Sequence, residues 1–123
     1  MRPNHWIAAG AFSAALAVAL GAFGAHALEG TLDAGELEVW RTAVHYQGLH
    51  ALALIAFGLY RARFAGSDLA GWGFLVGSVL FSGSLYGLAL DGPRFLGPIT
   101  PLGGMALLFG WLVLALQALR LPR

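Results

Sequence analysis

The sequence predicts an all-α integral membrane protein, a bundle of four membrane-spanning helices with both chain termini in the cytoplasm. Of its 123 residues, 59% are hydrophobic and only 11% are charged, whereas a soluble domain has about 25% charged residues. The few charged residues are also clustered, and they separate four long stretches without Asp, Glu, Lys or Arg. We therefore expect residues 1–123 to form a single four-span domain.

Composition also excludes several classes of protein. A water-soluble globule could not cover its surface with so few charges, and disordered chains are poor in hydrophobic residues. The absence of cysteine excludes disulfides, thiolate metal sites and a cysteine nucleophile. A formal net charge of +1 does not favour binding to nucleic acid.

The charge-free stretches define the predicted helices, because a span needs about 20 mostly apolar residues. A helix in lipid also satisfies its own backbone hydrogen bonds. The predicted spans are residues 5–27, 36–60, 69–90 and 101–119.

Local signals mark where these helices begin. The first span resembles a signal peptide, with an Ala25-His26-Ala27 cleavage pattern, but its apolar run is longer than a signal peptide requires. For the second span, Asp33-Ala-Gly-Glu36 predicts a capping box. For the fourth, Thr100-Pro101 predicts an N-cap followed by proline at the first helical position.

The arginines predict the orientation. Short cytoplasmic loops carry an excess of Lys and Arg, and five of the seven arginines fall at the termini or in the loop at 61–68. The five are Arg2, Arg61, Arg63, Arg120 and Arg123, against Arg41 and Arg94 in the other two loops. Both termini are therefore expected in the cytoplasm.

Small residues predict where the helices pack, since they allow two backbones to approach closely in lipid. They form stripes on three of the predicted helices, and Gly73 with Gly77 makes a GxxxG pair. The stripes are interpreted as packing inside one bundle, with a homodimer face as the alternative. The packing residues are Gly10, Ala17, Gly21, Gly24, Gly73, Gly77, Gly103 and Gly110.

Polar side chains inside the spans are the best functional clue, because such groups are costly in a membrane. Under the predicted orientation they gather in the outer half of the bundle. The candidate polar layer comprises His26, Tyr46, Gln47, His50, Ser82, Ser84, Tyr86 and Thr100. His45 points away from the others and is assigned to the interface.

This layer admits three interpretations. The first is a hydrogen-bond network that bridges helices. The second is a haem or metal site with His26 and His50 as ligands, although two histidines without a carboxylate give a weak metal signal. The third is a site for a quinone, a lipid headgroup or a proton near His50, Gln47 and Tyr86. A hydrolase is disfavoured because no acid within the spans could orient a Ser–His pair.

Four motifs, in order, resemble the family catalogued as domain of unknown function 423, also called the transmembrane protein 256 family. The resemblance covers essentially the whole chain. It implies a small four-span protein of the bacterial cytoplasmic membrane and implies no reaction. The motifs are residues 21–28, 40–54, 81–86 and 97–104, and the matching positions are His26, Trp40, Tyr46, Gln47, His50, Ser82, Ser84, Tyr86, Thr100 and Pro101. His45 departs from the family pattern, in which glutamine is more frequent.

The sequence therefore predicts a non-enzymatic membrane protein that assembles with, or binds, a partner or lipid. One alternative is a haem-, metal- or quinone-binding protein that uses His26 and His50, for example a respiratory accessory. The other is a small channel or transporter, which would require an oligomer because four helices hardly enclose a pore. The lipid bilayer is the expected partner, and a homo-oligomer or a larger membrane complex is compatible with the sequence. No cofactor is specified.

Overall fold

The computed structural model describes residues 1–121, so residues 122 and 123, including the predicted cytoplasmic Arg123, lie outside the described part. Within residues 1–121 the chain consists of helices and loops, without strands, and the predicted all-α class is confirmed. The helical elements are α1 (Pro3–Val18), η1 (Ala19–Gly24), α2 (Ala25–Leu28), α3 (Ala34–Arg63), α4 (Leu69–Ala89) and α5 (Leu96–Leu119).

Among the described residues, three stretches are long and apolar enough to cross a membrane. They are Pro3–Leu28, Leu69–Ala89 and Leu96–Leu119. The remaining helix, α3, has 30 residues and is the most polar of the long helices. Its charged residues lie toward its two ends, and His45, Gln47 and His50 lie between them.

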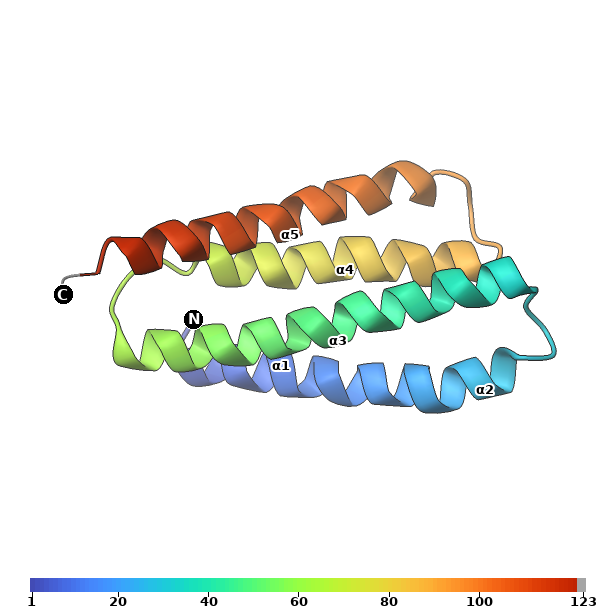
Figure 1. Ribbon diagram of the computed structural model, residues 1–123, viewed down its shortest axis with the longest axis horizontal. Coiled ribbons are helices and arrows are strands. Elements are labelled where there is room, and N and C mark those ends of the chain that lie inside the picture. The colour runs from blue at the N-terminus through green and yellow to red at the C-terminus, as the bar shows by residue number, and fades with distance from the viewer. Residues whose placement is uncertain (122–123) are drawn as a thin grey trace.

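α1, η1 and α2 follow one another without a break and form one continuous helix (blue to cyan in Figure 1). In η1 the helix widens to the i→i+5 pattern, so that the Ala25 N–H donates to the Leu20 carbonyl. The Trp40 indole Nε1–H of α3 donates to the same carbonyl at 2.9 Å. The wide turn is therefore stabilised by a bond from the neighbouring helix.

The capping box predicted at the start of α3 is confirmed. The Asp33 side chain accepts from the Glu36 backbone N–H at 2.8 Å, and the Glu36 side chain accepts from the Asp33 N–H at 3.0 Å. The helix begins at Ala34, two residues before the predicted span, and continues to Arg63. The structure thus extends the predicted helix at both ends.

The predicted start of the fourth span is wrong. α5 begins at Leu96 rather than at Pro101, and Thr100 lies inside the helix instead of capping it. Pro98 lies in the first turn, where a backbone N–H has no helical partner in any case. Pro101 falls in the second turn and removes only the N–H that would bond the Gly97 carbonyl, a loss that the helix tolerates.

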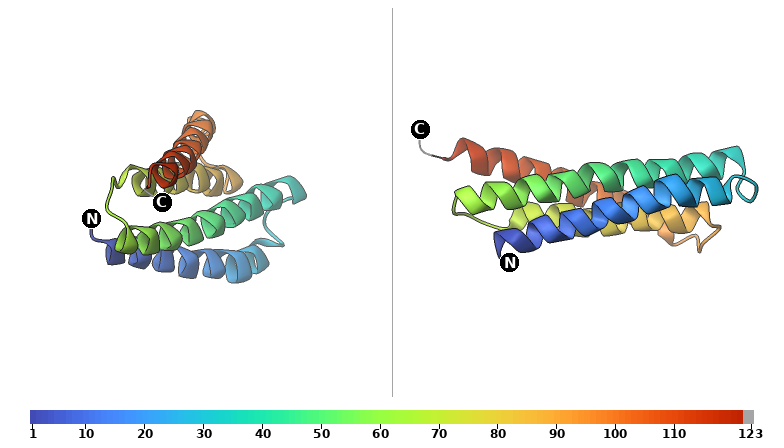
Figure 2. Two further views of the ribbon diagram at one scale, coloured as in Figure 1. Left: turned by 60° about the vertical axis from the view of Figure 1, so that its left-hand side comes forward. Right: turned by 90° about the horizontal axis from the view of Figure 1, so that it is seen from below.

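The long helices run roughly along one axis, and the start of α1 lies at the same end as the end of α5 (Figure 1). The closely packed pairs are α1 with α3, α3 with α4, and α4 with α5. The left-hand view in Figure 2 shows the same succession, with α3 and α4 in the middle. Each outer helix therefore rests mainly on one neighbour, and grooves remain beside it.

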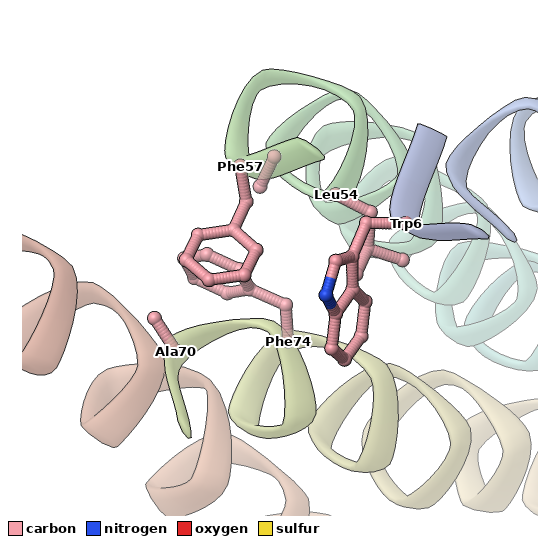
Figure 3. Close-up of a cluster of buried hydrophobic side chains, with 6 residues drawn as sticks. Trp6, Leu54, Phe57, Ala70 and Phe74 are labelled. Carbon is pink, nitrogen blue, oxygen red and sulfur yellow. The ribbon is translucent and has the colours of Figure 1, made fainter. Parts of the chain in front are cut away.

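A cluster of buried hydrophobic side chains, three of them aromatic, joins the start of α1 to α3 and α4 (Figure 3). Trp6, Phe57 and Phe74 are fully buried, and Leu54 and Ala70 complete the contact. The rings of Trp6 and Phe57 meet edge to face with centroids 5.6 Å apart, the geometry that aromatic pairs prefer. Dispersion contacts of this kind hold helices together where lipid offers no hydrophobic gain.

Asp68 organises the loop between α3 and α4. Its carboxylate accepts from Arg61 Nε at 3.1 Å, from the Trp6 indole at 3.3 Å and from the Met1 amino group at 3.2 Å. Burial alone would raise the pKa of Asp68, but the bonds from Arg61, the amino group and Trp6 outweigh it and hold that pKa below its ordinary value. Asp68 therefore stays ionised and ties α1 and α3 to the start of α4.

The small residues of the predicted stripes lie at helix contacts within this chain. A Cβ added to Gly73 would lie 2.9 Å from the Gly110 Cα, and one added to Gly10 would lie 2.5 Å from the Ala51 carbonyl oxygen. Ala17 is buried. A Cβ added at five other glycines would come similarly close to a neighbouring residue: Gly21 to Val44, Gly24 to Trp40, Gly77 to Leu107, Gly103 to Phe81 and Gly110 to Phe74.

We expect Gly10→Ala to lower the stability of the protein, because the added methyl would also lie 2.7 Å from Ile55 Cγ1. Overpacking of this kind costs about 1–3 kcal/mol. Thermal unfolding of the purified protein in detergent measures the change. Gly48→Ala is the matched control, since a Cβ there has no neighbour within 4 Å and alanine favours helix by ~1 kcal/mol. An equal loss in both variants would contradict the packing role of Gly10.

Candidate functional site

Most of the predicted polar residues lie at contacts between helices, and Gln47 links three of the helices. The Tyr86 hydroxyl of α4 donates to Gln47 Oε1 at 2.6 Å. Gln47 Nε2 donates to the Ser13 carbonyl of α1 at 3.1 Å, and the Ser13 hydroxyl lies 3.4 Å away. The side chain of Gln47 is buried, so one amide in α3 links α1 and α4.

Two serines add further links from α4. The buried Ser82 hydroxyl donates to the Ala43 carbonyl of α3 at 2.8 Å. The hydroxyls of Ser84 and Thr100 lie 2.5 Å apart and join α4 to α5. Thr100 also donates to the Leu96 carbonyl at 3.4 Å, the back-bond that a threonine inside a helix commonly forms.

His50 connects α3 to α5 and uses both ring nitrogens. Nδ1 lies 2.8 Å from the Tyr46 carbonyl, and Nε2 lies 2.9 Å from the Trp111 indole Nε1. A carbonyl only accepts and an indole N–H only donates. These partners assign the proton to Nδ1 and make Nε2 the acceptor, so the ring is neutral and has no free nitrogen for another ligand.

A groove between α3 and α5 opens beside His50, and we call it the Tyr46 groove. Its volume is about 440 Å³, within the usual range for small-molecule sites. The Tyr46 ring lies nearly parallel to the His50 ring, with the ring centroids 6.3 Å apart. It also contacts the Phe81 ring, with the centroids 4.7 Å apart. The lining residues are Tyr46, Leu49, His50, Phe81, Pro101, Gly104, Met105, Leu107, Leu108 and Trp111.

The hydroxyl of Tyr46 differs from that of Tyr86. Tyr46 is 38% exposed, and within residues 1–121 its hydroxyl has no hydrogen-bond partner. Its O–H is therefore available at the side of the groove, whereas the Tyr86 hydroxyl is used within the protein.

A second groove of about 430 Å³ lies on the α1 and α4 side. Ser78, Ser82 and Tyr86, which are spaced four residues apart on α4, all line it together with Ser13 and Gln47. The donors and acceptors of Gln47 and Tyr86 are used in the bonds described above. Leucine, valine and phenylalanine side chains form most of the remaining wall.

His26 does not join the polar layer, and its predicted place there is wrong. Its side chain is 86% exposed at the end of α2, where Nδ1 lies 3.8 Å from Glu29 Oε2. His26 follows Gly24, which faces Trp40, whereas His50 lies ten residues farther along α3. At 1.5 Å per residue, the two histidines are separated by roughly 15 Å along the helix axis. They cannot ligate one haem or metal ion, and residues 1–121 contain no cluster of three potential metal ligands.

Sequence reasoning missed Ser13 and Trp111, and it named Trp40 only as a position of family resemblance. Ser13 lies on a helix of small apolar residues, and a lone serine there gives no distinct signal. The tryptophans match the general expectation for aromatic residues in membrane proteins. Only the structure shows that their N–H groups point to Leu20 and His50. A buried Trp N–H usually requires a partner, and that rule was the available signal.

The sequence profile of the family described as "Protein of unknown function (DUF423)" matches residues 20–104. This range includes most of η1, all of α2, α3 and α4, and the first part of α5. The chain belongs to this family. The predicted resemblance is thereby confirmed, and the matched range contains Gln47, His50, Ser82 and Tyr86 but not Ser13 or Trp111.

Curated bacterial relatives share most of the chain. The chain is 46% identical to UPF0382 membrane protein SERP0230 of Staphylococcus epidermidis, over 94% of this chain and 95% of that protein. It is 44% identical to UPF0382 membrane protein YwdK of Bacillus subtilis, over 94% and 96%. It is 40% identical to UPF0382 inner membrane protein YgdD of Escherichia coli, over 92% and 88%. No solved structure matches the chain. This is a family of membrane proteins of unknown function.

We expect Tyr86→Phe to destabilise the protein, because it leaves the buried Gln47 carbonyl without its donor. Hydrogen bonds between membrane helices contribute about 0.6–2 kcal/mol. Tyr46→Phe deletes an identical hydroxyl that has no protein partner, so its stability should equal that of the wild type. Thermal unfolding of both variants in detergent provides the comparison. Equal stabilities of the two variants would refute the bridging role of Tyr86.

Proposed function

We propose that this chain is a four-span integral membrane protein with both termini in the cytoplasm. In this proposal α3 is the fourth span, and its charge-free part between Arg41 and Arg61 crosses the hydrocarbon. The start of α1, the loop after α3 and the end of α5 lie at one end of the molecule (Figure 1). Arg2, Arg61, Arg63 and Arg120 lie at that end, which supports its assignment to the cytoplasmic side.

Single cysteines test this topology directly, because the chain contains none of its own. We expect a membrane-impermeant maleimide, added to intact cells with a permeabilised outer envelope, to label Thr31→Cys and not Ser67→Cys. Both residues should react once the cytoplasmic membrane is opened. Labelling of both from the same side would overturn the four-span arrangement, and the reverse pattern would overturn the orientation.

We further propose that the protein is a non-enzymatic binding protein for a membrane-soluble amphiphile. Gln47 and Tyr86 are engaged in hydrogen bonds between helices. Both nitrogens of His50 are also engaged, one by the Tyr46 carbonyl of the same helix and the other by Trp111 of α5. This argues against an acid, base or metal ligand in the layer. The polar layer instead sets the positions of the helices that form the Tyr46 groove.

One observation carries the choice of ligand class. The Tyr46 groove combines exposed flat rings, apolar walls and a single free hydroxyl donor. Flat rings favour stacking with a planar head, the hydroxyl favours a head that accepts a hydrogen bond, and the walls favour an apolar tail. Quinones have all three properties. A helix of a partner protein is about 10 Å wide, so it fits this groove between two rows of side chains less well than a quinone does.

The experiment is a titration of the purified protein with a short-chain ubiquinone, read by thermal unfolding. We expect the wild type to be stabilised in a concentration-dependent manner. Met105→Trp, which fills the groove, should abolish the effect, and Tyr46→Phe should weaken the affinity several-fold by removing the donor.

The matched control is Leu112→Trp, which adds the same bulk to α5 at a lipid-facing position outside the groove. It should respond as the wild type does. If ubiquinone stabilised Met105→Trp as much as the wild type, the ligand would bind elsewhere. If a linear alkane stabilised the wild type as much as ubiquinone does, the groove would not recognise the planar head of the quinone. Either result would refute the proposal.

A further inference from the structure

A third cavity lies at the other end of α5 from the Thr100 contact, and the function proposed above does not use it. Its volume is about 450 Å³, and it is bounded by the loop before α4, the start of α4 and the last turns of α5. Ser67, Gln117 and Arg120 line it with polar groups, and Leu69, Val113 and Leu116 line it with apolar groups. The cavity is thus amphipathic.

The polar side of this cavity is rich in hydrogen-bond donors. Within residues 1–121, Arg120 forms no ion pair. The Ser67 hydroxyl accepts from the Leu69 N–H at 3.0 Å, so its own proton is free to donate. Gln117 Nε2 donates to the Ser67 carbonyl at 3.3 Å, which uses one of its two hydrogens. The Gln117 carbonyl oxygen is buried and has no hydrogen-bond partner within residues 1–121, so it is not accessible to an occupant of the cavity.

Within residues 1–121, the carboxylate of Asp68 does not neutralise Arg120. Asp68 follows Ser67 in the chain but is bonded to Arg61, Trp6 and the Met1 amino group. It is not among the residues that line the cavity. The donor set therefore keeps a net positive charge, and an anion is the ligand that complements it.

The position of the cavity indicates which anion fits. It lies at the end of an apolar helix, where a membrane-spanning segment leaves the hydrocarbon, and its apolar wall continues along α5. A guanidinium matches the geometry of a phosphate and pairs with it in two parallel hydrogen bonds. We propose that this cavity binds the phosphate of an anionic phospholipid, with Arg120 as the main contact and the apolar wall against an acyl chain.

The test uses the full chain purified in a neutral detergent. Phosphatidylglycerol should raise the Tm by about 4 °C or more at saturating concentration. Diacylglycerol, which has the tails without the phosphate, should not raise it. Glycerol phosphate, which has the phosphate without the tails, should not raise it either. A full shift with diacylglycerol would overturn the recognition of phosphate, and a full shift with glycerol phosphate would overturn the assignment to a lipid.

A pair of variants locates the site. Arg120→Gln should abolish the shift, while Arg63→Gln, which removes an equal charge at the same end but outside the cavity, should keep it. Equal loss in both variants would overturn the proposal in favour of diffuse attraction to positive charge. Native mass spectrometry provides a second readout that does not depend on Tm, because Arg120→Gln should retain less bound phosphatidylglycerol than Arg63→Gln.

The phospholipid site proposed here and the quinone site of the proposed function can be tested independently. Met105→Trp closes the Tyr46 groove and leaves the Arg120 cavity intact, so this variant should lose the response to quinone and keep the response to phosphatidylglycerol. Loss of both responses in Met105→Trp would overturn the assignment of two independent sites.

Discussion

The buried amide of Gln47 is the constraint on which the arrangement of helices depends. An amide side chain inside a low-dielectric protein is costly unless both its carbonyl and its NH₂ group are paired. Ser13 and Tyr86 meet this requirement from two different helices, and each can do so in only one register of its helix against α3. Ser82 adds a second bond between α4 and α3, and His50 joins α3 to α5. Polar pairing therefore specifies which faces meet, while the small residues let the helices approach closely.

The polar residues of α3 are compatible with a membrane because α3 is a central helix. Its polar groups Gln47 and His50 are covered by α1, α4 and α5, whereas the outer helices present leucine, valine and phenylalanine to their surroundings. The same placement explains why hydropathy selects three helices and omits α3. A helix that is shielded by its neighbours needs less apolar surface than one that faces lipid. The low hydropathy of α3 is thus compatible with the proposal that α3 is the fourth span.

Much of this structure could be predicted from the sequence, and the failures have physical causes. The capping box at Asp33 was predictable because its determinants lie within four residues. The start of α5 was mispredicted because Pro98 and Pro101 are both compatible with an early turn, and only tertiary contacts such as Ser84 with Thr100 select the longer helix. His26 was misplaced because its direction depends on how the chain leaves η1. The role of Trp111 depends on a contact 61 residues away, which no local pattern contains.

The wide turn at Ala19–Gly24 has a consequence for how this family can vary. A turn of this type contains one residue more than the α-helical turn that would span the same length, and the helix continues on both sides of it. The surplus residue is absorbed where the Trp40 indole bonds the Leu20 carbonyl, so Gly10 before the turn and Gly24 after it both face α3. A related chain that lacks one residue in this segment can form a regular helix and still keep both contacts. Gaps in an alignment of the family are therefore compatible with an unchanged fold here, in a part of a transmembrane helix where they would otherwise rotate every following side chain.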